Sequence, residues 1–106
     1  MKTTLIVITA FISPFTKDRE FARTLVKNDE FIEVFVDTPI EICESRDTKG
    51  LYQKARDGMI KDFTGVSSPY EKPTNPQMHL NTDVQTTEES VNHILNYLKK
   101  KGHLNA

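Results

Sequence analysis

Residues 31–41 read FIEVFVDTPIE, and this stretch decides the fold class of the chain. Its first six residues, FIEVFV, are rich in β-branched and aromatic side chains, which favours a strand. Directly afterwards, Thr38 is predicted to cap a helix that has Pro39 at its first position and Glu41 reaching back to the cap. The helix is expected to end near Arg46. A strand that passes at once into a helix indicates an α/β fold.

Strand and helix signals continue to alternate on both sides of this stretch. The apolar run Leu5 to Phe11 is predicted as a buried parallel strand, because such strands need apolar side chains on both faces. Lys17 to Asn28 is predicted as a helix whose spacing sets one apolar face toward the core. That face consists of Phe21, Ala22, Leu25 and Val26.

The C-terminal third is predicted to add one strand and one helix. The segment Ser68 to Pro76 is rich in proline and reads as a loop, and Met78 to Thr82 reads as a short strand. Thr86 and Glu89 then form a capping box for a helix that ends before Gly102. The whole order predicts part of a doubly wound parallel sheet, with three strands and flanking helices, whose ligands bind at the carboxyl ends of the strands.

Composition excludes several classes of function. The 106 residues are 37% hydrophobic and 27% charged, with a net charge of -1, so one globular domain without a basic field for nucleic acid is expected. Cys43 is the single cysteine and has no partner for a disulfide or a zinc site. The N-terminal apolar run is too short for a membrane span and lacks the cleavage site of a signal peptide. A cytoplasmic location is therefore expected.

Residues 49–65, KGLYQKARDGMIKDFTG, carry little apolar periodicity and are predicted to form a flap. Basic side chains outnumber acidic ones here, and three glycines interrupt the stretch. Such a segment suits closure over an anionic, nucleotide-like ligand, because cations gain most where anionic oxygens are shielded from water. Phe63 is expected either to stack on a purine or to latch the loop through apolar contacts.

The ends of the predicted strands carry the other candidate residues. Ser13 precedes Pro14 and is predicted to be extended, either as a ligand contact or as a loop hydrogen bond. Asp37 and Asp83 also follow strands, but helix-terminus electrostatics and turn chemistry account for them. The three histidines, His79, His93 and His103, are scattered and are expected to be structural or solvated.

Taken in order, the segments TAFISPF, DRE, FIEVFVDTPIEICESRDTKGLYQKARDGMIKDFTG and VSSPYEKP resemble the C-terminal part of adenylylsulfate kinases. The resemblance covers about residues 5–98 and rests on the succession of FISP, EVFVD, KGLY and FTG. It implies a P-loop kinase fold in which ATP, with Mg²⁺, phosphorylates the ribose 3'-hydroxyl of adenosine 5'-phosphosulfate. Residues 1–106 then form the C-terminal portion of one kinase domain, with a lid at about 46–66.

The same resemblance implies roles for particular residues. Ile12 and Ser13 contact the substrate, and Ser13 matches the position that the family labels a phosphoserine intermediate. Because in-line phosphoryl transfer needs only positioning and charge stabilisation, Ser13 also suits a substrate-binding role. The remaining substrate contacts are Lys49, Asp62, Phe63 and Thr64, and Gln85 contacts ATP.

The chain departs from the family pattern in one important respect. No glycine-rich GxxxxGK[ST] phosphate loop occurs in the 106 residues, so the donor-phosphate site is missing and little transfer is expected from these residues alone. In the family fold the P-loop strand lies between the strands at 5–11 and 31–36, whose exposed edges predict a marginal or oligomeric fold. Two readings follow. The chain is either the C-terminal portion of a kinase that acts with a P-loop-bearing complement, or a non-catalytic nucleotide-binding remnant or partner subunit.

Overall fold

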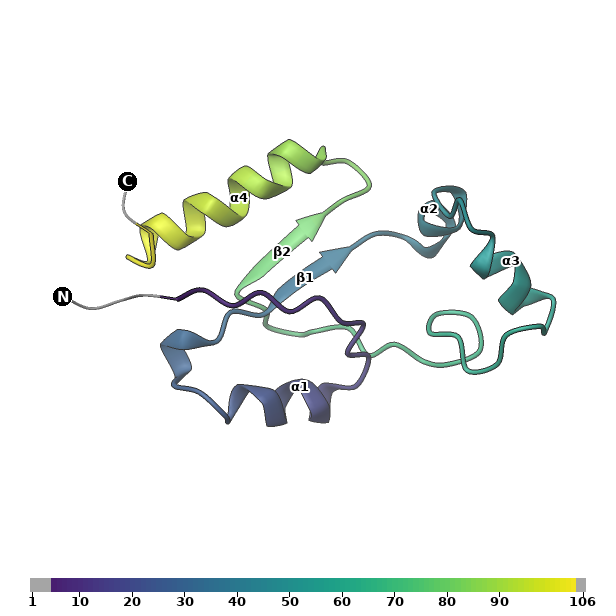
Figure 1. Ribbon diagram of the computed structural model, residues 1–106, viewed down its shortest axis with the longest axis horizontal. Helices are drawn as coiled ribbons and strands as arrows, with labels where there is room; N and C mark the ends of the chain where they lie inside the picture. Colours follow the sequence, from purple (N-terminus) through teal and green to yellow (C-terminus); the bar gives the residue numbers. More distant parts are fainter. Residues whose placement is uncertain (1–4, 105–106) are drawn as a thin grey trace.

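A two-stranded parallel sheet forms the centre of the computed structural model, which describes residues 5–104 (Figure 1). Strand β1 (Val34–Asp37) pairs with strand β2 (Met78–Asn81), and Val34 lies opposite Met78. Parallel pairing of two strands so far apart in the chain requires a crossover connection, and the lid supplies part of it. The α/β class with parallel strands is confirmed.

The core is small. Among the described residues, the buried apolar side chains of the sheet are Phe35, Met78 and Leu80, and Ala55 is buried within the lid. Helix α4 (Thr87–Lys100) runs alongside β2 (Figure 1). Its predicted capping box is confirmed, because the Glu89 amide donates to the Thr86 hydroxyl and the Thr86 amide donates to the Glu89 carboxylate, at 3.1 and 3.0 Å. The hydrogen bond from the Thr86 backbone amide, followed by one from the Thr86 side chain, lowers the pKa of the Glu89 carboxyl.

The prediction of a third strand at Leu5 to Phe11 is wrong in this structure. The segment is extended coil, and its side chains are exposed, Ile8 to 86% and Phe11 to 82%. A strand exists only where another strand satisfies its backbone groups, and no strand within residues 5–104 pairs with this segment. Apolar composition therefore identified a segment suited to a sheet, but not its pairing.

Helix α1 (Thr16–Arg23) is shorter than predicted, and a 3₁₀ turn, η1 (Asn28–Glu30), follows it. The prediction that its apolar face is core is also wrong, since Phe21 is 66% exposed and Leu25 is exposed as well. The spacing for an amphipathic helix is present. Burial needs a covering layer, which the described residues do not provide for this face.

Helix α2 (Ile40–Ser45) begins after Pro39, and no side chain caps it, so the predicted capping box at Thr38 is wrong. The Thr38 hydroxyl instead hydrogen-bonds with the Thr82 hydroxyl. The two threonines follow the adjacent strands β1 and β2, so the register of the sheet brings them together. Because the Thr38 hydroxyl bonds with Thr82, it does not cap the N-terminus of α2.

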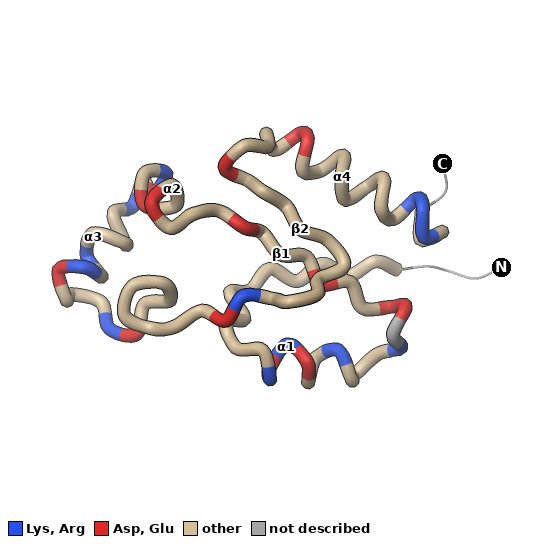
Figure 2. Tube along the Cα trace, turned by 180° about the vertical axis from the view of Figure 1, so that it is seen from behind, with Lys and Arg blue, Asp and Glu red and all other residues tan. Residues whose placement is uncertain are grey.

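The lid, residues 46–66, projects from the sheet together with α2 (Figure 1). It contains a helix that the sequence did not predict, α3 (Leu51–Arg56). The molecule measures 55 × 30 × 23 Å with a radius of gyration of 16.3 Å, against about 13 Å for a compact domain of this size. Basic and acidic side chains are interspersed along α2 and the lid (Figure 2).

No helix within residues 5–104 is both long enough and apolar enough to cross a bilayer.

Candidate functional site

A groove of about 1220 Å³ opens along β1, between the N-terminal segment, helix α1 and the loop after the lid helix. Its walls come from segments that are distant in sequence, among them Ile12 and Ser13, Asp18 and Arg19 of α1, Phe31 to Ile40, and Ile60 to Tyr70. The groove therefore borders the whole of β1 and extends past its carboxyl end, which is where ligands of α/β folds bind.

Ser13 lies at the groove, but its backbone differs from the prediction. It has φ 44°, in the left-handed region, and is not extended. Pro14 disfavours the right-handed α conformation of the residue before it, and the tertiary structure then selects a turn. The Arg19 guanidinium donates a hydrogen bond of 2.6 Å to the Ser13 carbonyl oxygen, which stabilises this turn.

Asp62, Phe63 and Thr64 form the opposite part of the groove wall. The Phe63 carbonyl oxygen accepts hydrogen bonds from the amides of Val66, Ser67 and Ser68 at 2.9 to 3.0 Å. The Ser67 hydroxyl accepts from the Phe63 amide at 2.7 Å. A tight loop therefore fixes the backbone that carries the aromatic ring.

The Phe63 ring contacts Tyr52 of α3 edge-to-face, with centroids 4.9 Å apart. This contact is the apolar latch that was one of the two expectations for Phe63. It leaves the ring half-buried at the groove, so a second, ligand-facing role is geometrically open to it. Burial, followed by the neighbouring Cys43, raises the pKa of the Tyr52 phenol.

Gly65 is required where this loop passes α2. Its φ is 87°, and a Cβ placed on it would lie 2.7 Å from Cδ1 of Ile40. We expect Gly65→Ala to lower the free energy of unfolding by about 2 kcal/mol, from strain and overpacking together. Urea denaturation measures this effect.

Gly58→Ala is the matched control for that substitution. Gly58 also has a positive φ, of 79°, but a Cβ there would meet no atom within 4 Å. The decrease in the free energy of unfolding of Gly58→Ala should therefore come from backbone strain alone. Equal destabilisation by the two substitutions would show that Cδ1 of Ile40 moves aside and that overpacking adds nothing to the cost at Gly65.

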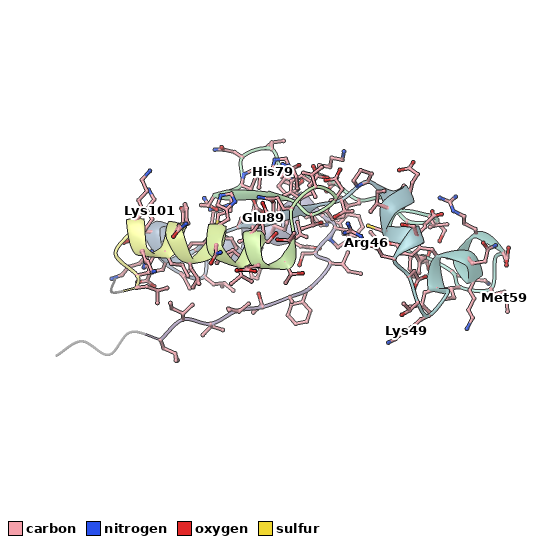
Figure 3. All side chains as sticks on the ribbon, turned by 90° about the horizontal axis from the view of Figure 1, so that it is seen from above. Arg46, Lys49, Met59, His79, Glu89 and Lys101 are labelled. Atoms are coloured by element: carbon pink, nitrogen blue, oxygen red, sulfur yellow. The ribbon has the colours of Figure 1, made fainter. Side chains whose placement is uncertain are left out.

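Lys49 does not line the groove in this structure. It is exposed, and Figure 3 shows it at the outer part of the lid, with Met59 also directed away from the sheet. The cations that do line the groove are Arg19, Lys61 and Lys72. The expected cationic cover is therefore present in the lid, but most of it is turned away from the cavity.

Hydrogen bonds hold the lid together as a preformed unit. The Arg56 guanidinium pairs with the Glu44 carboxylate through its Nε at 2.8 Å, which joins α3 to α2. The Asp47 carboxylate accepts from the backbone amides of Lys49 and Tyr52. Arg46 donates to the Thr82 carbonyl oxygen at 2.9 Å, which ties the base of the lid to the loop after β2.

Gln85 lies outside the groove, in the same loop after β2. Its side-chain oxygen accepts from the Asn81 amide at 2.9 Å, so it closes the turn that leads into α4. The structure therefore brings together Ile12, Ser13, Asp62, Phe63 and Thr64, and it leaves Lys49 and Gln85 apart from them.

Sequence reasoning missed a cluster of aromatic rings beside the groove. His79 donates to or accepts from Asp37 at 2.8 Å and stacks on Phe35, with centroids 4.9 Å apart. Tyr70 stacks on the same Phe35 ring, and burial raises the pKa of its phenol. The parallel register, which sets Phe35 opposite His79, is the signal that could have found this cluster. His79 thus contacts other residues of the fold while its side chain stays 48% exposed, and its role as structural or solvated remains a prediction.

A magnesium ion, which the family resemblance implies, finds no assembled site among the described residues. Within residues 5–104, no three side chains of His, Cys, Asp or Glu come together in a metal-binding group. Asp37 offers one carboxylate at the groove, and its Oδ2 already pairs with His79. Cys43 is a free thiol on α2.

Comparison with known proteins identifies the family. The family model described as adenylylsulphate kinase matches residues 1–81. The chain belongs to the adenylylsulphate kinase family. The adenylyl-sulfate kinase of Marinobacter nauticus is 56% identical over 97 residues, which are 92% of this chain and 49% of that protein. The adenylyl-sulfate kinase of Halothermothrix orenii is 52% identical over 101 residues, 95% of this chain and 54% of that protein.

A solved adenylylsulfate kinase has the same arrangement of elements. The structure of the Mycobacterium tuberculosis APS kinase in complex with AMPPNP and APS matches with a TM-score of 0.76 and 43% identity. The match covers 84% of this chain and 52% of that one. The family predicted from the FISP to FTG series, and its kinase fold, are confirmed. The chain spans about half the length of the relatives that it matches.

Proposed function

We propose that these residues form the acceptor side of an adenylylsulfate kinase, which binds adenosine 5'-phosphosulfate in the groove and presents its ribose 3'-hydroxyl for phosphorylation by ATP. One observation carries the proposal. The groove joins Ile12 and Ser13 to Asp62, Phe63 and Thr64, two segments that are distant in sequence and that the family resemblance associates with the same ligand.

The side chains at the groove suit such a ligand. The Phe63 ring offers a surface for adenine, because every purine has a π-face. Lys61 and Lys72 add positive charge for the phosphosulfate group. In this proposal Ser13 positions the substrate through its hydroxyl and backbone. A phosphoserine at this position is the alternative role, which mass spectrometry of the protein after turnover would detect.

The donor side of the reaction, where ATP binds, needs groups that the residues at the groove do not supply. The 106 residues contain no GxxxxGK[ST] loop to cradle the phosphates of ATP and to place the hydroxyl that binds Mg²⁺. Transfer is therefore proposed to require a P-loop-bearing segment in addition to these residues, with Gln85 contacting ATP. A second candidate, which the same groove supports, is a non-catalytic protein that binds the nucleotide. Both proposals include a cytoplasmic location.

Lys49 supports substrate binding in this proposal only after the lid moves toward the groove. We expect Lys49→Ala to weaken adenylylsulfate binding about tenfold, because a cation closing on an anionic ligand makes a charge-assisted contact. Isothermal titration calorimetry of the purified protein with adenylylsulfate measures the dissociation constant, and raised salt should reduce the difference.

Lys54→Ala is the matched control, since Lys54 carries the same charge in α3 of the same lid. A specific contact predicts that Lys54→Ala changes the affinity by less than about twofold. Equal losses for the two variants would reduce the role of Lys49 to the general charge of the lid. No binding of adenylylsulfate by the unmodified protein would overturn the proposed function itself.

A further inference from the structure

Arg19 is the most highly connected side chain near the groove. It projects from α1, and its side chain is only 9% exposed. Its guanidinium hydrogen-bonds or pairs with groups from four places in the chain. These groups are the Ser13 carbonyl oxygen, the Thr16 hydroxyl, the Glu71 carbonyl oxygen and the Glu33 carboxylate.

Two of these bonds bridge the walls of the groove. Arg19 donates to the carbonyl oxygens of Ser13 and Glu71, each at 2.6 Å. Two further bonds join the same segments, from the Glu71 amide to the Pro14 carbonyl at 2.8 Å and from the Thr16 amide to the Glu71 carboxylate at 2.7 Å. The Ser13 turn is thus fastened to the proline-rich loop through one guanidinium and its neighbours.

The other contacts fix the guanidinium itself. Nε of Arg19 lies 3.4 Å from the carboxylate of Glu33, whose side chain is 12% exposed, just before β1. The guanidinium also lies 5.9 Å from the centre of the Tyr70 ring, which stacks on Phe35 of the sheet. A charge this buried needs a partner, and Glu33 supplies it. The guanidinium is therefore held in one orientation relative to the sheet.

We propose that Arg19 is a positioning residue, which sets the Ser13 turn at the groove and so determines how well the groove binds its ligand. The left-handed φ of 44° at Ser13 is an unfavourable conformation for a serine, and it persists where surrounding contacts determine it. Arg19 supplies the strongest of those contacts, with a planar fork of donors that lysine does not reproduce. The identity of the ligand, adenylylsulfate, rests on the proposed function.

Hydrogen exchange and ligand titration on Arg19→Met test this inference together. Without the guanidinium, we expect the Glu71 amide, which bonds to Pro14, to exchange with solvent about tenfold faster. We expect the dissociation constant for adenylylsulfate to rise about tenfold as well, because the Ser13 turn is no longer held. Arg19→Lys should fall between the unmodified protein and Arg19→Met in both measurements.

Arg23→Met is the matched control. Arg23 lies on the same helix and also pairs with Glu33, at 3.6 Å, but its guanidinium stacks over Phe31 and makes none of the Ser13 contacts described for Arg19. Its loss should change exchange at Glu71 and ligand affinity by less than about twofold. If circular dichroism finds Arg19→Met unfolded, Arg19→Lys carries the comparison.

Two outcomes would overturn the inference. One is unchanged exchange at Glu71 in Arg19→Met, or in Arg19→Lys where that variant carries the test. The other is faster exchange with an unchanged dissociation constant. Failure of the unmodified protein to bind adenylylsulfate is a different result, which removes the proposed function. The exchange comparison then still decides whether Arg19 holds the Ser13 turn.

Discussion

The 106-residue chain, given ATP, Mg²⁺ and adenylylsulfate, is expected to form 3'-phosphoadenylylsulfate at least about a thousandfold more slowly than when a P-loop-bearing half of a relative is added. The reason is electrostatic. Phosphoryl transfer depends on groups that place and neutralise the phosphates of ATP, and the sequence contains no loop for them. Chromatographic separation of the nucleotide products measures the rate.

The control for complementation is the same P-loop half with its phosphate-binding lysine replaced by alanine. This half should still associate with the chain but should not restore turnover. The added half alone is the second control, because it lacks the groove. Rapid turnover by the 106-residue chain without any addition would contradict the account of a missing donor site.

Replacement of Phe63 by alanine is expected to weaken adenylylsulfate binding about thirtyfold, which corresponds to about 2 kcal/mol for one stacked base. The ring lies at the groove on a loop whose backbone is fixed by the Ser67 hydroxyl and by three amides. Little ordering is therefore needed before it meets a ligand, which favours a large effect. Titration calorimetry measures the two dissociation constants.

Phe63 also contacts Tyr52, and this contact latches the loop to α3. A loss of affinity in Phe63→Ala could therefore come from loss of the latch and not from loss of stacking on the ligand. Phe63→Leu separates the two roles, because leucine keeps apolar contact with Tyr52 but has no π-face. Stacking predicts that Phe63→Leu binds nearly as weakly as Phe63→Ala. Restored affinity in the leucine variant would instead support the latch.

Phe21→Ala is the matched control for loss of an aromatic side chain. Phe21 lies on α1, is 66% exposed and does not line the groove. Its replacement should leave the dissociation constant unchanged. A comparable loss of affinity in this variant would show that the effect of Phe63→Ala is indirect.

Much of the fold was predictable from local signals. The strands predicted at 31–36 and 78–82 are observed at Val34–Asp37 and Met78–Asn81, and the capping box at Thr86 lies where the sequence placed it. Each depends on side-chain type or on hydrogen bonds within a few residues. Helix α3 was missed because residues 51–56 lack apolar periodicity, while the Asp47 carboxylate stabilises the start of the helix by accepting the Tyr52 amide.

The candidate site was predictable through the family resemblance far more than through composition. FISP and FTG supplied Ile12, Ser13 and Phe63, which the fold does bring to one groove. The position of Lys49 depends on the orientation of the lid, and the pairing of His79 with Asp37 depends on the register of the sheet. The spacing of motifs along the sequence specifies neither the orientation of the lid nor the register of the sheet.

By itself, the sequence determined the family of this protein, the α/β class and the segments suited to strands and helices. Only the tertiary structure decided that Leu5 to Phe11 stays unpaired, that Ser13 adopts a left-handed turn and that Arg19 bridges the two walls of the groove. The physical reason is that propensities, caps and motifs act between near neighbours in the chain. Strand pairing, burial and long-range hydrogen bonds depend on which distant groups are present to satisfy them.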